Sequence, residues 1–252
     1  MLPETLPITG LPSGKIPASV LVCGDPARAT AIANKFDDFE QLSEKREYRS
    51  YVGTYDNIPV AVCSHGIGSP GAAIAFEELI SAGARRLIRV GTCGGLQEDI
   101  VSGHLVLATA AVQNIGYARE VVPQGFPAAA DIDISYALKQ AAAGFKGPWS
   151  SGFVLTRDSF YQGLDLSAKP DYRQLAKAHI LAVEMECAAL FIISSLRGVK
   201  AGAILTVDGN VLESDGESME SYDPDNNVVY EAISIATRIA LDALVLLSNG
   251  SD

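Results

Sequence analysis

The chain has 252 residues, of which 48% are hydrophobic and 19% are charged, and its formal net charge is −11. This balance is typical of a globular protein rather than a disordered one, and the length fits one α/β domain, residues 1–252, with a sizeable core. Because an acidic surface repels nucleic acid and anionic membranes, we expect neither as a partner. An anionic small-molecule ligand would therefore need a local positive pocket.

Strands and helices are predicted to alternate along the chain. The predicted strands are 18–23, 50–55, 59–65, 86–90, 104–112, 152–157, 180–184 and 202–209, and the predicted helices are 26–36, 71–83, 134–144, 185–198 and 228–247. Asp56-Asn57 between the second and third strands indicates a hairpin. Since several strands are continuously apolar, we predict an α/β fold with a mixed central sheet flanked by helices on both sides.

Two connections, 113–130 and 209–227, are long for a compact domain. Connections of this length are often functional lids. The second is polar and acidic, which fits a lid and a solvated connection equally well.

The N-terminus lacks the basic region and apolar run of a signal peptide, and no apolar segment is long enough to cross a bilayer. The four cysteines, Cys23, Cys63, Cys93 and Cys187, show neither a C-x-x-C pair nor a metal-binding spacing, which fits reduced core cysteines. The sequence therefore predicts a cytoplasmic protein.

Two predicted strand ends are suited to an anion. The first strand runs into CGDPAR, where Gly24 lies in a turn and Arg28 in the first turn of a helix, although a plain helix cap explains them too. Another strand, LIRVGTCGG, carries Arg89 between apolar residues and Thr92 just beyond. An unpaired buried charge is costly, so Arg89 either points outward or meets an anion.

Two further strand ends carry carboxylates. Glu184 and Glu186 bracket Met185 where a strand becomes a helix, so they are suited to accept hydrogen bonds from sugar hydroxyls, or they are first-turn acids favoured by the helix dipole. Asp208 follows an apolar run in LTVDG and is either a turn residue or an acid that burial keeps protonated. A phosphate nucleophile, a ribose and a purine leaving group would use this whole set.

At these residues the sequence resembles the nucleoside phosphorylase-I family, in its uridine phosphorylase and hexameric purine nucleoside phosphorylase branch, and most of all the apicomplexan purine nucleoside phosphorylases. The resemblance covers nearly the whole chain and implies a partly barrel-like sheet. The matching segments are GDPAR (24–28), KREYRSYVGTY (45–55), SHGIGSPGAAIAFEELISAGARRLIRVGTCGGLQ (64–97), GFPAAADIDI (125–134), SFYQG (159–163), VEMECAAL (183–190) and ILTVDG (204–209).

The resemblance implies a role for each candidate residue. The residues implied at phosphate are Gly24, Arg28, Arg89, Thr92 and, from a neighbouring subunit, Arg46. The implied ribose site consists of Met185 and Glu186, with Glu184 beside them. The implied base pocket consists of Cys93, Gly94, Phe160 and Val183, with Asp208 protonating or hydrogen-bonding purine N7. A site shared in this way implies a homo-oligomer, either a dimer or a trimer of dimers.

The expected reaction is phosphorolysis of purine nucleosides, with inorganic phosphate as co-substrate and without a cofactor or metal. A uridine or broad-specificity phosphorylase, a hydrolytic nucleosidase and a non-catalytic nucleoside-binding protein remain alternatives. Leu164 and Leu166 stand where uridine phosphorylases of the family carry a Gln and an Arg, which disfavours uridine, although Gln162 could compensate. The family's N-terminal His, which reaches a neighbour's ribose 5′-hydroxyl, is replaced by Ile8 or Thr9.

Overall fold

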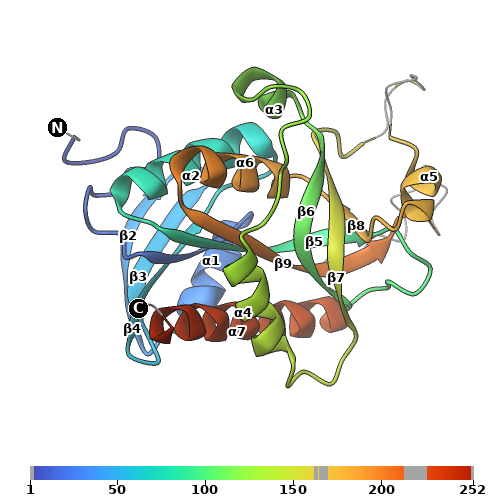
Figure 1. The fold of residues 1–252 in the computed structure, drawn as a ribbon. Helices are drawn as coiled ribbons and strands as arrows, with labels where there is room; N and C mark the ends of the chain where they lie inside the picture. The colour runs from blue at the N-terminus through green and yellow to red at the C-terminus, as the bar shows by residue number, and fades with distance from the viewer. Residues whose placement is uncertain (1–2, 162–163, 165–169, 213–225, 251–252) are drawn as a thin grey trace.

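The computed structural model describes residues 3–161, 164, 170–212 and 226–250 (Figure 1). Gln162, Leu166 and most of the connection 209–227 lie outside these described residues. The strands form one sheet in the order β2-β3-β4-β1-β5-β8-β7-β6-β9. Their bounds are β1 Ser19–Cys23, β2 Asp38–Lys45, β3 Tyr48–Tyr55, β4 Ile58–Ser64, β5 Arg86–Gly95, β6 Leu105–Asn114, β7 Trp149–Arg157, β8 Ala182–Glu184 and β9 Lys200–Asn210.

The central strand β5 closes half of this sheet into a barrel. It pairs with β1 and β9 in parallel and with β8 in antiparallel fashion, so that β5, β8, β7, β6 and β9 form a ring. The strands β2, β3, β4 and β1 extend outward from the ring as an open sheet (Figure 1). The predicted mixed, partly barrel-like sheet is therefore confirmed, and β5 lies where its two halves meet.

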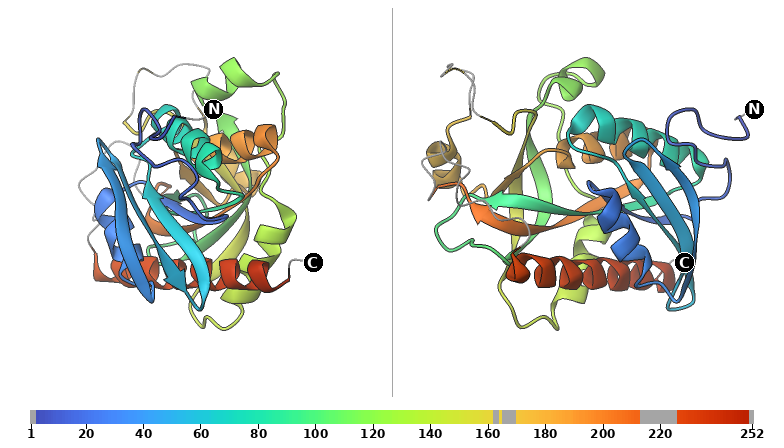
Figure 2. Two further views of the ribbon diagram at one scale, coloured as in Figure 1. Left: turned by 90° about the vertical axis from the view of Figure 1, so that its left-hand side faces the viewer. Right: turned by 180° about the vertical axis from the view of Figure 1, so that it is seen from behind.

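Helices cover both faces of the sheet, as predicted (Figure 2). The helices α2 and α6 contribute to one apolar cluster, and α1, α4 and α7 contribute to a second on the opposite face. The helix bounds are α1 Pro26–Ala33, α2 Ser69–Ala82, α3 Gly116–Val121, α4 Ile132–Ala142, α5 Tyr172–Lys177, α6 Cys187–Arg197 and α7 Asn227–Asn249. In the described part of the chain, no helix has the length and apolarity that a membrane span requires.

The hairpin was predicted from its turn residues, whereas a strand and a short helix were missed. The hairpin between β3 and β4 turns at Asp56 and Asn57, whose φ values of 48° and 64° are the left-handed ones that such a turn requires. The edge strand β2 was missed because its sequence, DFEQLSEK, is mostly polar and none of its residues is buried. The short helix α3 lies within the connection 113–130, which was predicted only as a long loop.

Candidate active site

Arg89 of β5 is buried, with 4% of its surface exposed, and carboxylates of its own chain surround it. Its Nη2 lies 2.5 Å from Oε2 of Glu186, and its Nε lies 3.3 Å from Oε2 of Glu184. Burial alone would lower the pKa of Arg89, but the two carboxylates outweigh it and raise the pKa, so the guanidinium stays charged. The charge in this apolar strand therefore points inward to anionic partners.

Gly91 makes room for this arrangement. A Cβ at this position would come within 2.6 Å of Cζ of Arg89, so the guanidinium lies directly against the β5 backbone. Arg89 can fold back over its own strand because the residue two positions further along has no side chain.

Glu184 ends β8 and is fully engaged by donors within the protein. Its carboxylate accepts hydrogen bonds from the backbone N–H groups of Glu186 at 2.8 Å and Cys187 at 2.9 Å, and from the Thr156 hydroxyl, besides its contact with Arg89. These N–H groups open helix α6, where the helix dipole favours a negative charge. Of the two readings of Glu184 drawn from the sequence, the structure therefore favours the helix-terminus acid over the sugar ligand.

Thr156 of β7 supports Glu184, and its replacement by valine is expected to weaken the fold. Its hydroxyl donates to Oε1 of Glu184 and accepts the N–H of Ala188 at 2.9 Å. Valine keeps the shape but leaves the buried Ala188 N–H unpaired, which should lower the free energy of unfolding by about 1–3 kcal/mol. Urea denaturation measures this loss. Thr156→Ser, which keeps the hydroxyl, is the control, and equal midpoints for the Val and Ser variants would contradict the assignment.

Glu186 joins two segments at the centre of the site. Its Oε1 accepts the N–H of Gly68, just before α2, at 2.6 Å, while its Oε2 faces Arg89. Burial raises the pKa of Glu186, and the positive charge of Arg89 counters part of that rise. The neighbouring Met185 is half-buried, and its carbonyl accepts from the Ser69 hydroxyl at 2.9 Å. The Gly68 corner before α2 and the corner between β8 and α6 are thus held against the Arg89 guanidinium.

Asp208, which the sequence left open between a turn residue and a buried acid, lies at a β-bulge of β9. The pairing of β5 with β9 places Cys93 opposite Val207 and Gly94 opposite Gly209, so Asp208 is the extra residue between them. A bulge re-aims the side chain it carries, and bulges are frequent beside active sites. Asp208 is half-buried. Burial of Cys93 raises the pKa of its thiol, and the negative charge of Asp208 raises it further, so the two side chains are neighbours.

An apolar wall lies next to Asp208. Gly94 pairs with Val183 across β5 and β8, and a Cβ on Gly94 would come within 2.6 Å of Cγ1 of Val211 and 3.4 Å of Cγ1 of Val183. The structure thus brings Cys93, Gly94, Val183 and Asp208 together, and it adds Val211, which sequence reasoning missed. Phe160 lies after β7, is 51% exposed and packs edge-to-face on Tyr161.

Of the predicted phosphate residues, Thr92, Arg28 and Gly24 lie near Arg89 or its neighbours, whereas Arg46 does not. Thr92 is half-buried on β5, three residues beyond Arg89, and the charge of Arg28, in the first turn of α1, acts on His65 and Glu186. Gly24 follows β1, and its carbonyl accepts the N–H of Gly66 at 2.9 Å. Arg46, by contrast, is exposed in the turn between β2 and β3, with a left-handed φ of 57°, and is not among the partners of Arg89 in the described part of the chain.

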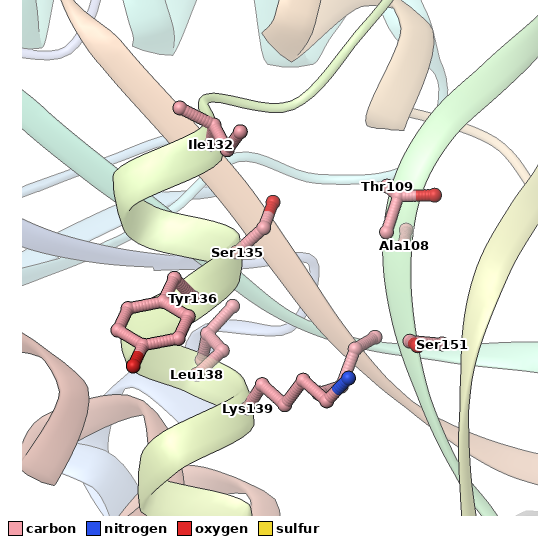
Figure 3. A pocket seen from close by; sticks show the side chains of 9 residues that line it. Ala108, Thr109, Ile132, Ser135, Tyr136, Leu138, Lys139 and Ser151 are labelled. Atoms are coloured by element: carbon pink, nitrogen blue, oxygen red, sulfur yellow. The ribbon is translucent and has the colours of Figure 1, made fainter.

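A hollow lies away from this cluster. It has a volume of about 240 Å³ and lies between α4 and the strands β6 and β7, where Tyr136, Lys139 and Ser151 contribute to its lining (Figure 3). None of the predicted site residues lines it. Across the described residues, no group of three or more His, Cys, Asp or Glu side chains is placed to hold a metal ion.

Comparison with known proteins identifies the class. Residues 19–245 match the family model of the phosphorylase superfamily. The chain is 39% identical to a uridine phosphorylase of Treponema pallidum, over 94% of this chain and 92% of that one, and 36% identical to a purine nucleoside phosphorylase of Plasmodium vivax, over 91% of each. A crystal structure of purine nucleoside phosphorylase from Toxoplasma gondii in complex with immucillin-H superposes with a TM-score of 0.91 at 33% identity, covering 100% of this chain and 99% of that one.

The chain therefore belongs to the phosphorylase superfamily. Within it, the chain is an enzyme of the nucleoside phosphorylase type, which is a pentosyltransferase, in agreement with the resemblance seen in the sequence.

Proposed function

We propose that this protein cleaves purine ribonucleosides and deoxyribonucleosides by phosphorolysis, releasing the free base and the sugar 1-phosphate. The observation that carries the proposal is the arrangement around β5. A buried guanidinium, Arg89, lies beside the Glu186 carboxylate, and a second carboxyl, Asp208, lies further along the same strand pair at the bulge. The groups proposed for the anion, the sugar and the base therefore lie on β5 or on the elements beside it.

The charges around Arg89 explain how phosphate would be held. One guanidinium between the carboxylates of Glu184 and Glu186 leaves one net negative charge, which by itself repels an anion. Further positive charge is needed, and Arg28 lies close enough to supply part of it. Thr92 and the N–H groups near Gly24 would add hydrogen bonds to the phosphate oxygens.

Arg46 would supply the remaining positive charge from a second copy of the chain. Its side chain is exposed in the β2–β3 turn and does not contact Arg89 of its own chain, so it is available to a neighbour. The working unit in this proposal is a dimer with shared sites, which a trimer of dimers would repeat.

The remaining residues would act on the nucleoside. Glu186 and Met185 would hold the ribose hydroxyls, while Glu184, whose oxygens already accept protein donors, would hold Glu186 and Arg89 in place. Phosphate would attack C1′ from the face opposite the base as the glycosidic bond lengthens. Negative charge would then develop on the purine, and Asp208 would relieve it by donating a proton to N7.

A uridine phosphorylase is the second candidate, because a relative of that name is 39% identical. Leu164, at the position where uridine phosphorylases of the family read the pyrimidine, is 83% exposed and has no polar group to offer a uracil. Purine therefore remains the proposed base.

A substrate panel tests the proposal. Base release is measured from inosine, adenosine, uridine and 5′-methylthioadenosine, each with and without phosphate. The expected result is release of purine that requires phosphate. Preferred cleavage of uridine would contradict the base assignment, release without phosphate would indicate a hydrolase, and no release from any substrate would favour a nucleoside-binding protein.

A further inference from the structure

His65, directly after β4, is fully buried beside the candidate site. Its Nε2 is 3.1 Å from Nη1 of Arg89, and its ring packs edge-to-face on Phe76 of α2 with centroids 5.3 Å apart. A Cβ on Gly24 would be 4.0 Å from Cε1 of His65. The imidazole therefore lies between the Gly24 turn and the Arg89 guanidinium, two elements that we assign to phosphate.

The two hydrogen bonds of His65 fix its protonation state. Nδ1 is 2.8 Å from the carbonyl oxygen of Gly66, which can only accept, so Nδ1 carries the hydrogen. Nε2 faces a guanidinium nitrogen, which can only donate, so Nε2 presents its lone pair. Both bonds require the neutral imidazole, in agreement with a pKa that burial, with a contribution from Arg89, places well below its ordinary value.

His65 completes a three-sided hold on the planar guanidinium. Nε of Arg89 is held by Glu184, Nη2 by Glu186 and Nη1 by His65, so the plane can neither rotate nor tilt freely. A carboxylate in the place of His65 would hold the plane equally well, but it would add a second net negative charge where phosphate must bind. A neutral acceptor orients the guanidinium without repelling the anion.

We propose that His65 is a positioning residue for phosphate, acting through Arg89 as an uncharged hydrogen-bond acceptor that fixes the orientation of the guanidinium. Each Nη of Arg89 carries a second N–H, and fixing the plane would orient these N–H groups toward phosphate oxygens. The inference rests on the proposed phosphorolysis, because it assigns His65 to the phosphate half of that reaction.

Two amide substitutions separate this role from a structural one. His65→Gln places an amide oxygen near the position of Nε2 and preserves the acceptor for Arg89. His65→Asn keeps an N–H for the Gly66 carbonyl but is too short to reach Arg89. We expect His65→Asn to raise KM for phosphate by about tenfold, as loss of a hydrogen bond to a charged group implies, with little change in KM for the nucleoside. His65→Gln should restore most of the phosphate affinity.

Equal KM values for phosphate in the Asn and Gln variants would overturn the inference, and so would an equal rise of both KM values in the Asn variant. These outcomes are distinct from failure of the proposed function, which wild-type base release without phosphate would reveal. Nitrogen NMR of the wild-type protein with labelled histidine provides a second test, which does not depend on whether a variant folds. Neutral His65 protonated at Nδ1 is expected at neutral pH, and an imidazolium or an Nε2–H form would overturn the inference.

Discussion

Replacing Arg89 by alanine is expected to lower kcat/KM for phosphate by about 10²–10³-fold, because it removes the buried positive charge at the proposed anion site. The guanidinium contacts Glu184 and Glu186, and Arg89 is buried, so water does not replace the lost charge. Steady-state kinetics with phosphate varied at saturating inosine measure the effect. An unchanged phosphate dependence would remove Arg89 from the site.

The same substitution should also destabilise the fold. It leaves two buried carboxylates without their counter-charge, and breaking a buried ion pair in this way costs about 3–5 kcal/mol. Arg89→Lys separates the two effects, since it retains the charge but loses the planar fork. We expect the Lys variant to unfold closer to wild type while KM for phosphate remains raised.

Arg197 offers a matched control at the surface. Its Nε and Nη2 lie 2.7 and 2.9 Å from the two carboxylate oxygens of Glu77, but its side chain is 51% exposed. Because exposed ion pairs contribute only about 0–1 kcal/mol, Arg197→Ala should leave stability and phosphate kinetics nearly unchanged. If Arg89→Ala has large effects and Arg197→Ala has none, the effects come from the buried position of Arg89 in the site and not from the loss of an arginine in general.

Replacing Asp208 by alanine is expected to lower kcat for inosine by about 10²–10⁴-fold, the range for loss of a general acid. KM for phosphate should change little, because Asp208 lies at the bulge beside Cys93, further along the β5–β9 pair than Arg89. Single-turnover measurements of base release isolate the step.

The chemistry of the leaving group makes this prediction sharper. A nucleoside methylated at N7 already carries the positive charge that Asp208 would supply, so its cleavage should lose much less in the alanine variant than that of inosine. Asp208→Asn, which retains a hydrogen-bond donor but no transferable proton, should fall between wild type and Ala on inosine. Equal losses for the methylated and unmethylated substrates would contradict proton donation to N7.

The sequence predicted those features that depend on local signals. Continuous apolar runs indicated the strands that cross the core, and Asp56-Asn57 indicated the hairpin, whereas β2 was missed because an edge strand buries none of its residues. The charge of Arg89 within an apolar strand raised the question of an anionic partner. Long-range packing alone identifies that partner as Glu184 and Glu186, which lie 95 and 97 positions further along the chain.

Other parts of the site carried little or no local signal. Thr156 is an ordinary strand residue until the β7–β8 pairing brings it to Glu184. For Asp208 the sequence left a turn residue and a buried acid open, because a bulge depends on the register of the neighbouring strand. His65 carried no local signal of a role, because its function as an acceptor depends on the tautomer that Gly66 and Arg89 impose.

Phosphorus NMR of the protein incubated with inosine and inorganic phosphate tests the central claim most directly. Phosphorolysis predicts that the phosphate signal falls while a ribose 1-phosphate signal rises in step with released hypoxanthine. If hypoxanthine appears while the phosphate signal remains constant, water is the nucleophile, and the assignment of Arg89 and its partners to phosphate is wrong.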